Sequence, residues 1–321
     1  MWLRIILLKI IYKLFIGIRE IIRPLRGFVF VIIVFGTSIF GNYIVTLFLP
    51  MITIFNFHRE WRSLMDRAIT FWMLIPLFFL HFIFRVKVKA IGDEIRFDEP
   101  SILIINHRTR LDWFYFYLVL WRMNPWLMTR NRIALKELLH FEIDKARMAR
   151  IIDYYAEMGQ PYQILMFPEG TDKTKNTSNS SDSYADREGL PRLKYLIYPR
   201  TAGFVHLVQK MRQLAYPCNN IIQNETEMLF FGKVSKQVNY AIRRFEQNEL
   251  PESDEDLHKW LNKIWSDKEE RLNDFYSKKQ NLQPYNNNNG LLKNNKIWKK
   301  DNWKQIIIKI FGFCFWCSVV P

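Results

Sequence analysis

Cysteine is scarce in this sequence. Its 321 residues include only three, Cys218, Cys314 and Cys317, which cannot form a disulfide framework. Cys314 and Cys317 have the CxxC spacing, but they lie in an apolar tail without partner ligands, so we expect neither a metal site nor a redox role for them. Acidic residues are also few, because 31 Asp and Glu stand against 46 Lys and Arg, for a net charge of +15. This positive excess predicts an acidic partner, either nucleic acid or an anionic lipid surface.

Charge is missing altogether from one long stretch. The 29 residues from Gly27 to Phe55 contain no charged side chain, and a helix of this length can cross a bilayer. A second apolar run, the 17 residues Ala68–Phe84, reaches only the lower limit for a span, so a re-entrant or interfacial helix is the alternative there. No nucleic-acid recognition motif is visible in the sequence. The apolar runs therefore favour a membrane partner.

The N-terminal 26 residues are basic. They carry six Lys and Arg against one acid, Glu20, and this flank is too extended for a cleaved signal peptide. Residues 1–18 have the pattern of an amphipathic helix lying on anionic headgroups, and the alternative is a simple basic flank of a membrane anchor. Further basic residues lie between the two apolar runs and after them. By the positive-inside rule, they favour a hairpin whose two ends face the cytosol.

Composition divides the chain into five parts. Residues 1–26 are the basic leader, and residues 27–84 form the membrane region, with one span followed by a second span or a re-entrant helix. Residues 85–276 have the mixed composition of a folded domain. Residues 277–304 are rich in Lys and Asn and predict a disordered linker. Residues 305–321 are apolar except for a single lysine and look like the beginning of another membrane segment.

The folded part has the pattern of an α/β protein. Continuous apolar runs predict buried strands over Ser101–Ile105, Gln163–Phe167 and Lys194–Tyr198. Asp112–Trp121 predicts one helix, and Arg132–Met158 predicts one or two. We therefore expect a mostly parallel sheet flanked by helices and preceded by N-terminal transmembrane helices. The polar run Asn176–Asp186 predicts a surface loop.

Residues 106–112, NHRTRLD, follow the first predicted strand. A histidine and an aspartate five positions apart suit a general base and the carboxylate that fixes its tautomer. This predicts His107 as the base and Asp112 as its partner. Thr109 and Asp112 also match a capping box, which would use the same carboxylate to begin the helix, and the two roles are compatible.

Residues 167–171, FPEGT, follow the next predicted strand. Pro168 ends the strand because it has no N–H to donate. Gly170 permits a backbone conformation that exposes amide donors to an anion. Ligands bind at the carboxyl ends of the strands in open α/β sheets, so His107 and Glu169 are expected at one site, although 62 positions separate them.

These two motifs resemble the best-known sequence blocks of the glycerolipid acyltransferases that use acyl-CoA. The order NHRTRLDW, then FPEGTD, then YPRTAGF at 198–204, is similar to the lysocardiolipin/lysophosphatidylinositol acyltransferase branch, as is KEERLNDFY at 268–276. The resemblance implies that residues 85–276 are an acyltransferase domain that moves a fatty acyl group to the free hydroxyl of a lysophospholipid. It also implies an integral membrane protein, with the endoplasmic reticulum as its location and the domain facing the cytosol.

The resemblance implies a role for each matching residue. His107 and Asp112 would be catalytic. Glu169 would contact the lipid headgroup, or alternatively support the base. The remaining candidates would bind substrate, with surface solvation or an ion pair as the alternative for the arginines: Gly170, Thr171, Arg108, Arg110 and Arg200. Acyl-CoA and a membrane lysophospholipid would be the substrates, with no cofactor, no metal and no nucleic acid.

One block of the family is not found in this chain. It has the form Gly-x-x-Phe-Ile-x-Arg, and its arginine is expected to bind the phosphate of the acyl acceptor. The interval from Asp112 to Phe167 contains no such word, and Arg147 and Arg150 have simpler roles in helical ion pairs. A sheet segment before Ala215–Pro217 also looks shortened. The alternative function is therefore a catalytically weak or inactive membrane protein that binds lipid.

Overall fold

The computed structural model describes residues 2–134, 141–159, 161–214, 221–224, 237–277, 296–298 and 301–319. They fall into two compact units. The first holds the described parts of 1–86 and 306–321, and the second holds those of 87–226 and 237–305. Each unit is considered by itself.

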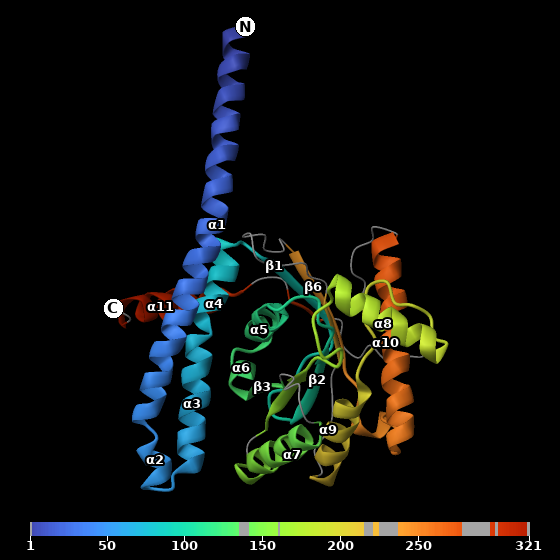
Figure 1. Ribbon diagram of the computed structural model, residues 1–321. Coiled ribbons are helices and arrows are strands. Elements are labelled where there is room, and N and C mark those ends of the chain that lie inside the picture. Colours follow the sequence, from blue (N-terminus) through green and yellow to red (C-terminus); the bar gives the residue numbers. More distant parts are fainter. Residues whose placement is uncertain are drawn as a thin grey trace. The chain divides into compact units, whose positions relative to one another are not determined.

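The first unit is helical. The long helix α1 (Trp2–Leu47) runs without interruption through the basic leader and ends within the first apolar run, with Pro24 inside it (Figure 1). The indole N–H of Trp72, at the end of α3, donates a hydrogen bond to the hydroxyl of Thr37 on α1 at 3.0 Å. The other helices follow in order: α2 (Pro50–Thr53), α3 (His58–Trp72), α4 (Leu74–Phe78), the π-helical turn η1 (Phe79–Ile83) and α11 (Trp303–Val319).

Two helical stretches of this unit are long and apolar enough to cross a membrane. They are Pro24–Thr53 and His58–Ile83. The first contains most of the predicted span. The second is 26 residues long, because the polar start of α3 continues directly into the apolar run that begins at Ala68. Length and composition therefore permit two spans, as the fold prediction requires.

The C-terminal apolar segment packs within the same unit. The ring of Phe313 on α11 stacks on Phe78 with centroids 3.9 Å apart. The single lysine of this segment, Lys309, is fully buried, with Nζ 3.2 Å from Nδ1 of His81. A buried ammonium requires such a polar partner.

The second unit contains a seven-stranded sheet in the order β3-β4-β2-β5-β6-β1-β7. Its central pairs β2–β4, β3–β4, β2–β5 and β1–β6 are parallel, whereas β5–β6 and β1–β7 are antiparallel. The predicted mostly parallel sheet is thus confirmed. The strands are β1 (Lys87–Gly92), β2 (Ser101–Ile105), β3 (Asn131–Ala134), β4 (Gln163–Met166), β5 (Ile221–Asn224), β6 (Gln237–Arg243) and β7 (Lys296–Trp298).

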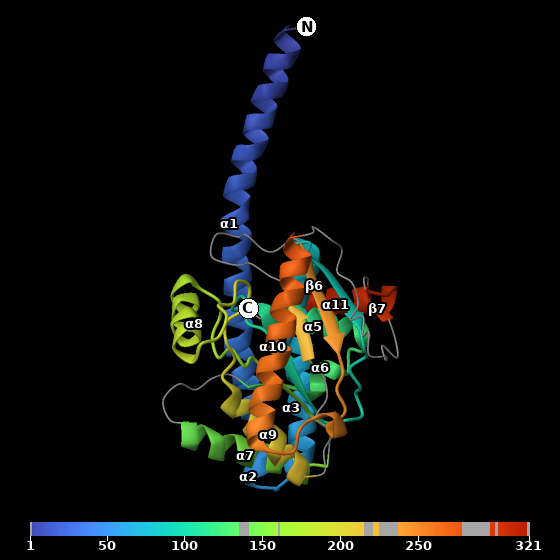
Figure 2. The ribbon, with the colours of Figure 1, turned by 90° about the vertical axis from the view of Figure 1, so that its right-hand side faces the viewer.

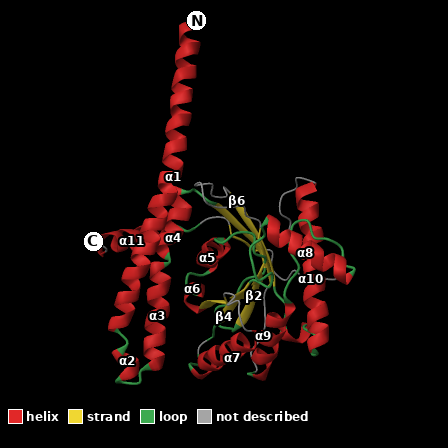
Figure 3. Cartoon of the chain, viewed as in Figure 1, coloured by secondary structure: helices red, strands yellow, loops and turns green. Residues whose placement is uncertain are grey.

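Helices cover both faces of this sheet (Figures 1 and 3). Helix α5 (Asp112–Met123) lies on one face, where Phe116 contacts Tyr240 of β6. The other face is covered by three helices, α7 (Phe141–Glu157), α9 (Thr201–Gln213) and α10 (Asp254–Ser277). Figure 2 shows α10 running along the sheet. The remaining elements are α6 (Leu127–Arg130), α8 (Lys175–Glu188) and the short 3-10 helix η2 (Gln247–Glu249).

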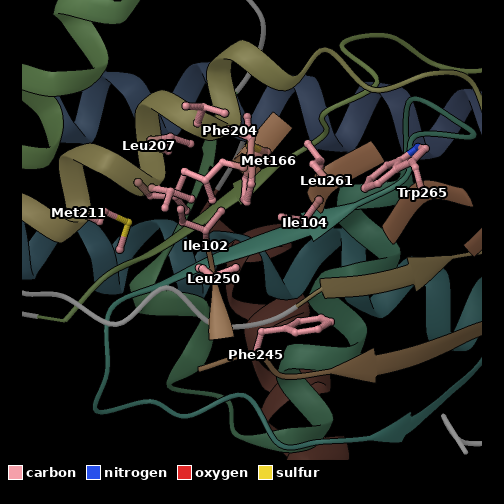
Figure 4. Close-up of a cluster of buried hydrophobic side chains, with 14 of the residues drawn as sticks. Ile102, Ile104, Met166, Phe204, Leu207, Met211, Phe245, Leu250, Leu261 and Trp265 are labelled. Carbon is pink, nitrogen blue, oxygen red and sulfur yellow. The ribbon is translucent and has the colours of Figure 1, made fainter. Parts of the chain in front are cut away.

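The main core lies between the sheet and these three helices. Figure 4 shows side chains of β2 and β4 meeting those of α9 and α10. At full burial, each aliphatic or aromatic side chain contributes roughly 1.5–3 kcal/mol to folding. Trp265 is among the largest fully buried side chains, and it lies where α10 passes the ends of β2 and β4.

Several predicted elements are confirmed. Ser101–Ile105 is β2, Gln163–Phe167 contains β4, and Asp112–Trp121 lies within α5. The prediction of helix from Arg132 onward is wrong at its start. There the residues up to Ala134 form β3, paired with β4.

The predicted strand Lys194–Tyr198 is wrong. Its amides do not join the sheet, because the carboxylate of Glu269 on α10 accepts N–H bonds from Lys194, Tyr195 and Leu196 at 2.6–3.1 Å. A side-chain carboxylate thus takes the place of a neighbouring strand. Apolar periodicity alone could not distinguish the two arrangements.

We expect Glu269→Ala to release this segment. Hydrogen bonds to a charged group contribute about 1.5–3 kcal/mol each, so the amides of Lys194, Tyr195 and Leu196 should exchange with deuterium at least ten-fold faster. Hydrogen-exchange mass spectrometry of the full chain would measure this. Glu270→Ala changes an exposed acid at the next position and should leave the exchange as it is. Equal protection in both variants would contradict the assignment.

The predicted surface loop Asn176–Asp186 is also wrong, because it lies within α8. A capping box between Thr174 and Thr177 begins this helix, and Gly189 ends it in the left-handed conformation with φ 66°. The helix is polar nearly all round, so it lacks the apolar stripe by which sequence analysis finds helices.

The predicted linker 277–304 lies mostly outside the described residues. Within it, Lys296–Trp298 forms β7 against β1, and Asp301 accepts a hydrogen bond from Arg122 at 2.9 Å. Ala215–Pro217, which follow the segment predicted to be shortened, also lie outside the described residues. Beyond them, β5 fills the place between β2 and β6.

Candidate active site

The two sequence motifs meet at one edge of the sheet. Strands β2 and β4 are parallel neighbours, with Ile104 opposite Met166. The motif loops therefore leave the same edge side by side. The ring of His107 contacts that of Phe167, with centroids 4.4 Å apart.

His107 and Asp112 form a close pair. Nδ1 of His107 lies 3.2 Å from Oδ2 of Asp112. The aspartate is fully buried, whereas the imidazole is 18% exposed. A carboxylate at Nδ1 places the proton there and leaves Nε2 as the basic nitrogen. The arrangement is that of a general base with its orienting carboxylate.

The same carboxylate also organises the loop. Oδ2 of Asp112 accepts backbone N–H bonds from Arg108 at 2.6 Å and Thr109 at 2.8 Å, and Oδ1 accepts from the Thr109 hydroxyl at 2.7 Å. Helix α5 begins at Asp112, so the chain turns between the two members of the pair and lets them converge. The carboxylate thus contacts the imidazole and also bonds the backbone N–H of Thr109, as in the predicted capping box. The prediction of Thr109 as the N-cap is wrong, because Leu111 is the N-cap of α5 and makes no side-chain cap bond.

Glu169 lies beneath His107. It is 2% exposed, and its Oε2 accepts the backbone N–H of His107 at 2.8 Å. Oε1 accepts the indole N–H of Trp265 at 3.3 Å. Burial raises the pKa of Glu169 to about 7, against the lowering effects of the His107 N–H and the Lys268 ammonium. Glu169 therefore bonds the main chain of His107 directly, and its role as headgroup contact or as support of the base stays a prediction.

The loop that contains FPEGT both accepts a hydrogen bond from the main chain of His107 and donates one to it. Gly170 has φ 70°, which an L-residue adopts only with strain, and its N–H donates to Phe167 at 2.9 Å. The N–H of Lys173 donates to the carbonyl of His107 at 2.9 Å. Thr171 lies between them with its hydroxyl 3.4 Å from Asp172. The two loops therefore hold each other through the main chain of His107.

The three candidate arginines lie around these loops. Arg108 donates from Nη1 to the hydroxyl of Tyr276 at 2.6 Å. Arg110 has a side chain that is 78% exposed, 3.9 Å from Asp172. Arg200 is exposed, and its backbone N–H donates to Pro168 at 2.7 Å. All three are thus on or beside the motif loops.

Helix α10 supplies site residues for which the sequence analysis predicted no role. Trp265 donates to Glu169, the hydroxyl of Tyr276 accepts from Arg108, and the charge of Lys268 lowers the pKa of Glu169. The apolar stripe of α10 continues through Lys268, which is 1% exposed. A charged residue at an apolar position of an amphipathic helix is the sequence signal that could have identified it.

Metal ligands do not cluster in the described part of the chain, where no group of three or more His, Cys, Asp or Glu side chains could hold an ion. Cys314 is exposed, and Cys218 lies outside the described residues.

Two protein-family models match the second unit, one over the motif loops and one over a later region that includes α10. Residues 86–220 match the Acyltransferase family, and residues 228–298 match the family described as Acyltransferase C-terminus. Lysophosphatidylinositol acyltransferase 10 of Caenorhabditis elegans is 37% identical over 335 positions, covering 94% of this chain and 84% of its own. That stretch is longer than the 321-residue chain, so the relative contains residues that this chain lacks.

Other relatives extend the same picture. Lysocardiolipin acyltransferase 1 of Mus musculus is 31% identical, over 80% of this chain and 75% of its own. A probable 1-acyl-sn-glycerol-3-phosphate acyltransferase 5 of Arabidopsis thaliana is 26% identical over 90% of this chain and 80% of its own. No solved structure matches. The chain is therefore an acyltransferase that belongs to the glycerolipid acyltransferase superfamily, in the lysocardiolipin/lysophosphatidylinositol acyltransferase branch.

Proposed function

We propose that this protein moves a fatty acyl group from acyl-CoA to the free hydroxyl of a lysophospholipid. The observation that carries the proposal is the pairing of His107 with the buried Asp112 at the carboxyl edge of the sheet. The acceptor class is supported by the relatives, whose names specify lysophosphatidylinositol and lysocardiolipin.

The proposed reaction needs one base. Nε2 of His107 removes the proton from the acceptor hydroxyl as its oxygen attacks the thioester carbonyl, and Asp112 stabilises the imidazolium that forms. The new C–O bond forms, the C–S bond breaks, and the CoA thiolate takes up a proton. Arg108, Arg110 and Arg200 are candidates to bind phosphate groups of the substrates, since guanidinium groups fork onto phosphate.

The site would work at a membrane surface. The two candidate spans precede the domain, and the basic residues that flank them favour a cytosolic domain. Acyl-CoA is made in the cytosol, which fits this orientation. We propose the endoplasmic reticulum as the location.

A second function has its own support. The family's arginine block is not found between Asp112 and Phe167, and the C. elegans relative contains residues that this chain lacks. Arg150, a candidate substitute, is exposed on α7 with Nε 3.4 Å from the carbonyl of Ala146. A chain without a phosphate-binding arginine would bind membrane lipid and transfer little or no acyl group.

The test is transfer of labelled oleoyl groups from oleoyl-CoA by membranes that contain the full chain. The acceptors are lysophosphatidylinositol, monolysocardiolipin and lysophosphatidic acid, with the His107→Ala variant as the background. Transfer to one acceptor that vanishes in the variant supports the enzyme and identifies the headgroup. Binding of phospholipid vesicles without transfer, from a folded and inserted chain, would support the second function instead.

A further inference from the structure

A lysine of helix α10 lies buried behind the catalytic loops. Lys268 is 1% exposed, and its Nζ lies 4.6 Å from the centroid of the Trp265 ring. The indole N–H of the same tryptophan donates to Glu169. Burial lowers the pKa of Lys268 to about 7, and the negative charge of Glu169, which is also buried, opposes that fall. An ammonium at such a site is costly to bury without a counter-charge.

Glu169 connects this lysine to the base. Its two oxygens accept from different donors, the backbone N–H of His107 and the indole of Trp265. A proton on either oxygen would occupy one of its lone pairs and weaken its bond to the N–H group. The ionised carboxylate is the stronger acceptor for both donors, so the strength of the bond that anchors the His107 backbone depends on the charge of Glu169.

We propose that Lys268 is a positioning residue of the active site, whose ammonium keeps Glu169 ionised so that the carboxylate holds the main chain of His107. Lys268 does not touch the substrate in this scheme. The inference rests on the proposed function, because it assigns a residue to the same reaction. It gives the C-terminal family region a part in catalysis, since Lys268 lies within residues 228–298.

The charges around Glu169 set the direction of the effect. Besides Lys268 on α10, they are His107 on the loop after β2 and Lys173 on the loop after β4. Burial raises the pKa of Glu169, and the Lys268 ammonium opposes that rise. Removing the ammonium would therefore raise this pKa further, and the carboxylate would be lost at a higher pH.

The test compares pH profiles of kcat/KM for oleoyl transfer. In the wild-type chain, activity should fall on the acid side of the profile as Glu169, whose pKa burial raises to about 7, takes up a proton. In Lys268→Met, this acid limb should move to higher pH by about 1 unit or more, the usual effect of one nearby opposite charge. Lys268→Arg, which keeps the charge, should move the limb back toward the wild type.

Two variants separate positioning from packing. Lys263→Met makes the same change at an exposed position of α10 and should leave the profile unchanged. The double variant Glu169→Gln/Lys268→Met removes both buried charges, so its profile should lose the part of the acid-side fall that Glu169 causes. It should also unfold at a higher temperature than Lys268→Met alone, because no buried charge is left unpaired.

A measurement that does not need acyl transfer tests the inference even if the wild-type chain is inactive. At pH 6–7, the amide of His107 should exchange with deuterium at least ten-fold faster in Lys268→Met than in the wild type, whereas peptides of α9 should not change. An inactive wild-type chain with this response would overturn the proposed function and keep the positioning contact. An active chain whose profile and exchange are the same in Lys268→Met and Lys263→Met would overturn the inference.

Discussion

Replacing His107 with alanine is expected to lower acyl transfer by roughly 10²–10⁴-fold, the usual contribution of a general base. The imidazole is partly exposed, and the main chain of His107, not its ring, makes the bonds to Glu169 and Lys173. Alanine keeps this main chain, so folding should be preserved. The measurement is kcat for oleoyl transfer by the full chain in membranes, together with its apparent unfolding temperature in detergent.

His206→Ala is the matched control for this variant. His206 lies on α9 with Nε2 3.2 Å from the carbonyl of Lys145, away from the motif loops. Its replacement should change kcat less than two-fold. Transfer that survives in His107→Ala at more than a tenth of the wild-type rate would exclude His107 as the base.

A related prediction concerns Asp112, the partner of His107. Asp112→Asn keeps a group of the same shape, so the turn bonds to Arg108 and Thr109 can persist, but the charge beside the imidazole is lost. We expect kcat to fall by about 10²-fold or more, with a smaller loss of stability than in Asp112→Ala, which leaves buried N–H groups without an acceptor. Equal kcat in Asp112→Asn and the wild type would exclude the orienting role.

The largest expected effect on stability comes from Trp265→Ala. The indole is fully buried between α10 and the sheet, and removing it should lower the free energy of unfolding by about 3–5 kcal/mol. The apparent unfolding temperature of the detergent-solubilised full chain should fall accordingly. Because Trp265 also donates to Glu169, activity should fall before the protein unfolds.

Two further variants separate the ring from its N–H group. Trp265→Phe keeps most of the buried ring and loses only the bond to Glu169, so it should cost about 1–3 kcal/mol. Trp126→Ala removes an indole that is 59% exposed and should change stability by less than about 0.5 kcal/mol. A Trp265→Ala protein as stable as Trp126→Ala would contradict the described core.

The sequence predicted the centre of the fold better than its borders. Strands β2 and β4 and helix α5 were predictable because each is a continuous apolar or aromatic run beside a clear terminator. Lys194–Tyr198 has the same pattern, yet the carboxylate of Glu269, 73 or more positions away, accepts its first three amides. Tertiary hydrogen bonds of this kind leave no trace in local periodicity.

The candidate site also has a part that the sequence predicted and a part that it did not. The meeting of His107 with Glu169 could be predicted, because both follow the carboxyl ends of strands that belong to one parallel sheet. The contribution of α10 could not be predicted, because the bond from Trp265 to Glu169, 96 positions earlier, depends on how α10 packs across the sheet. Local motifs thus identify the groups that meet substrate, and packing decides which groups hold them.

The sheet order also has a consequence for how this protein is made. Strand β1 has β6 and β7 as its two neighbours, and its first residue Lys87 is opposite Gln237, 150 positions later. At 5–20 residues per second, a ribosome needs roughly 8–30 s to supply that partner. During that interval β1 has both of its edges unpaired. The strand must therefore be kept from pairing wrongly until Gln237 and the residues after it arrive to close the sheet.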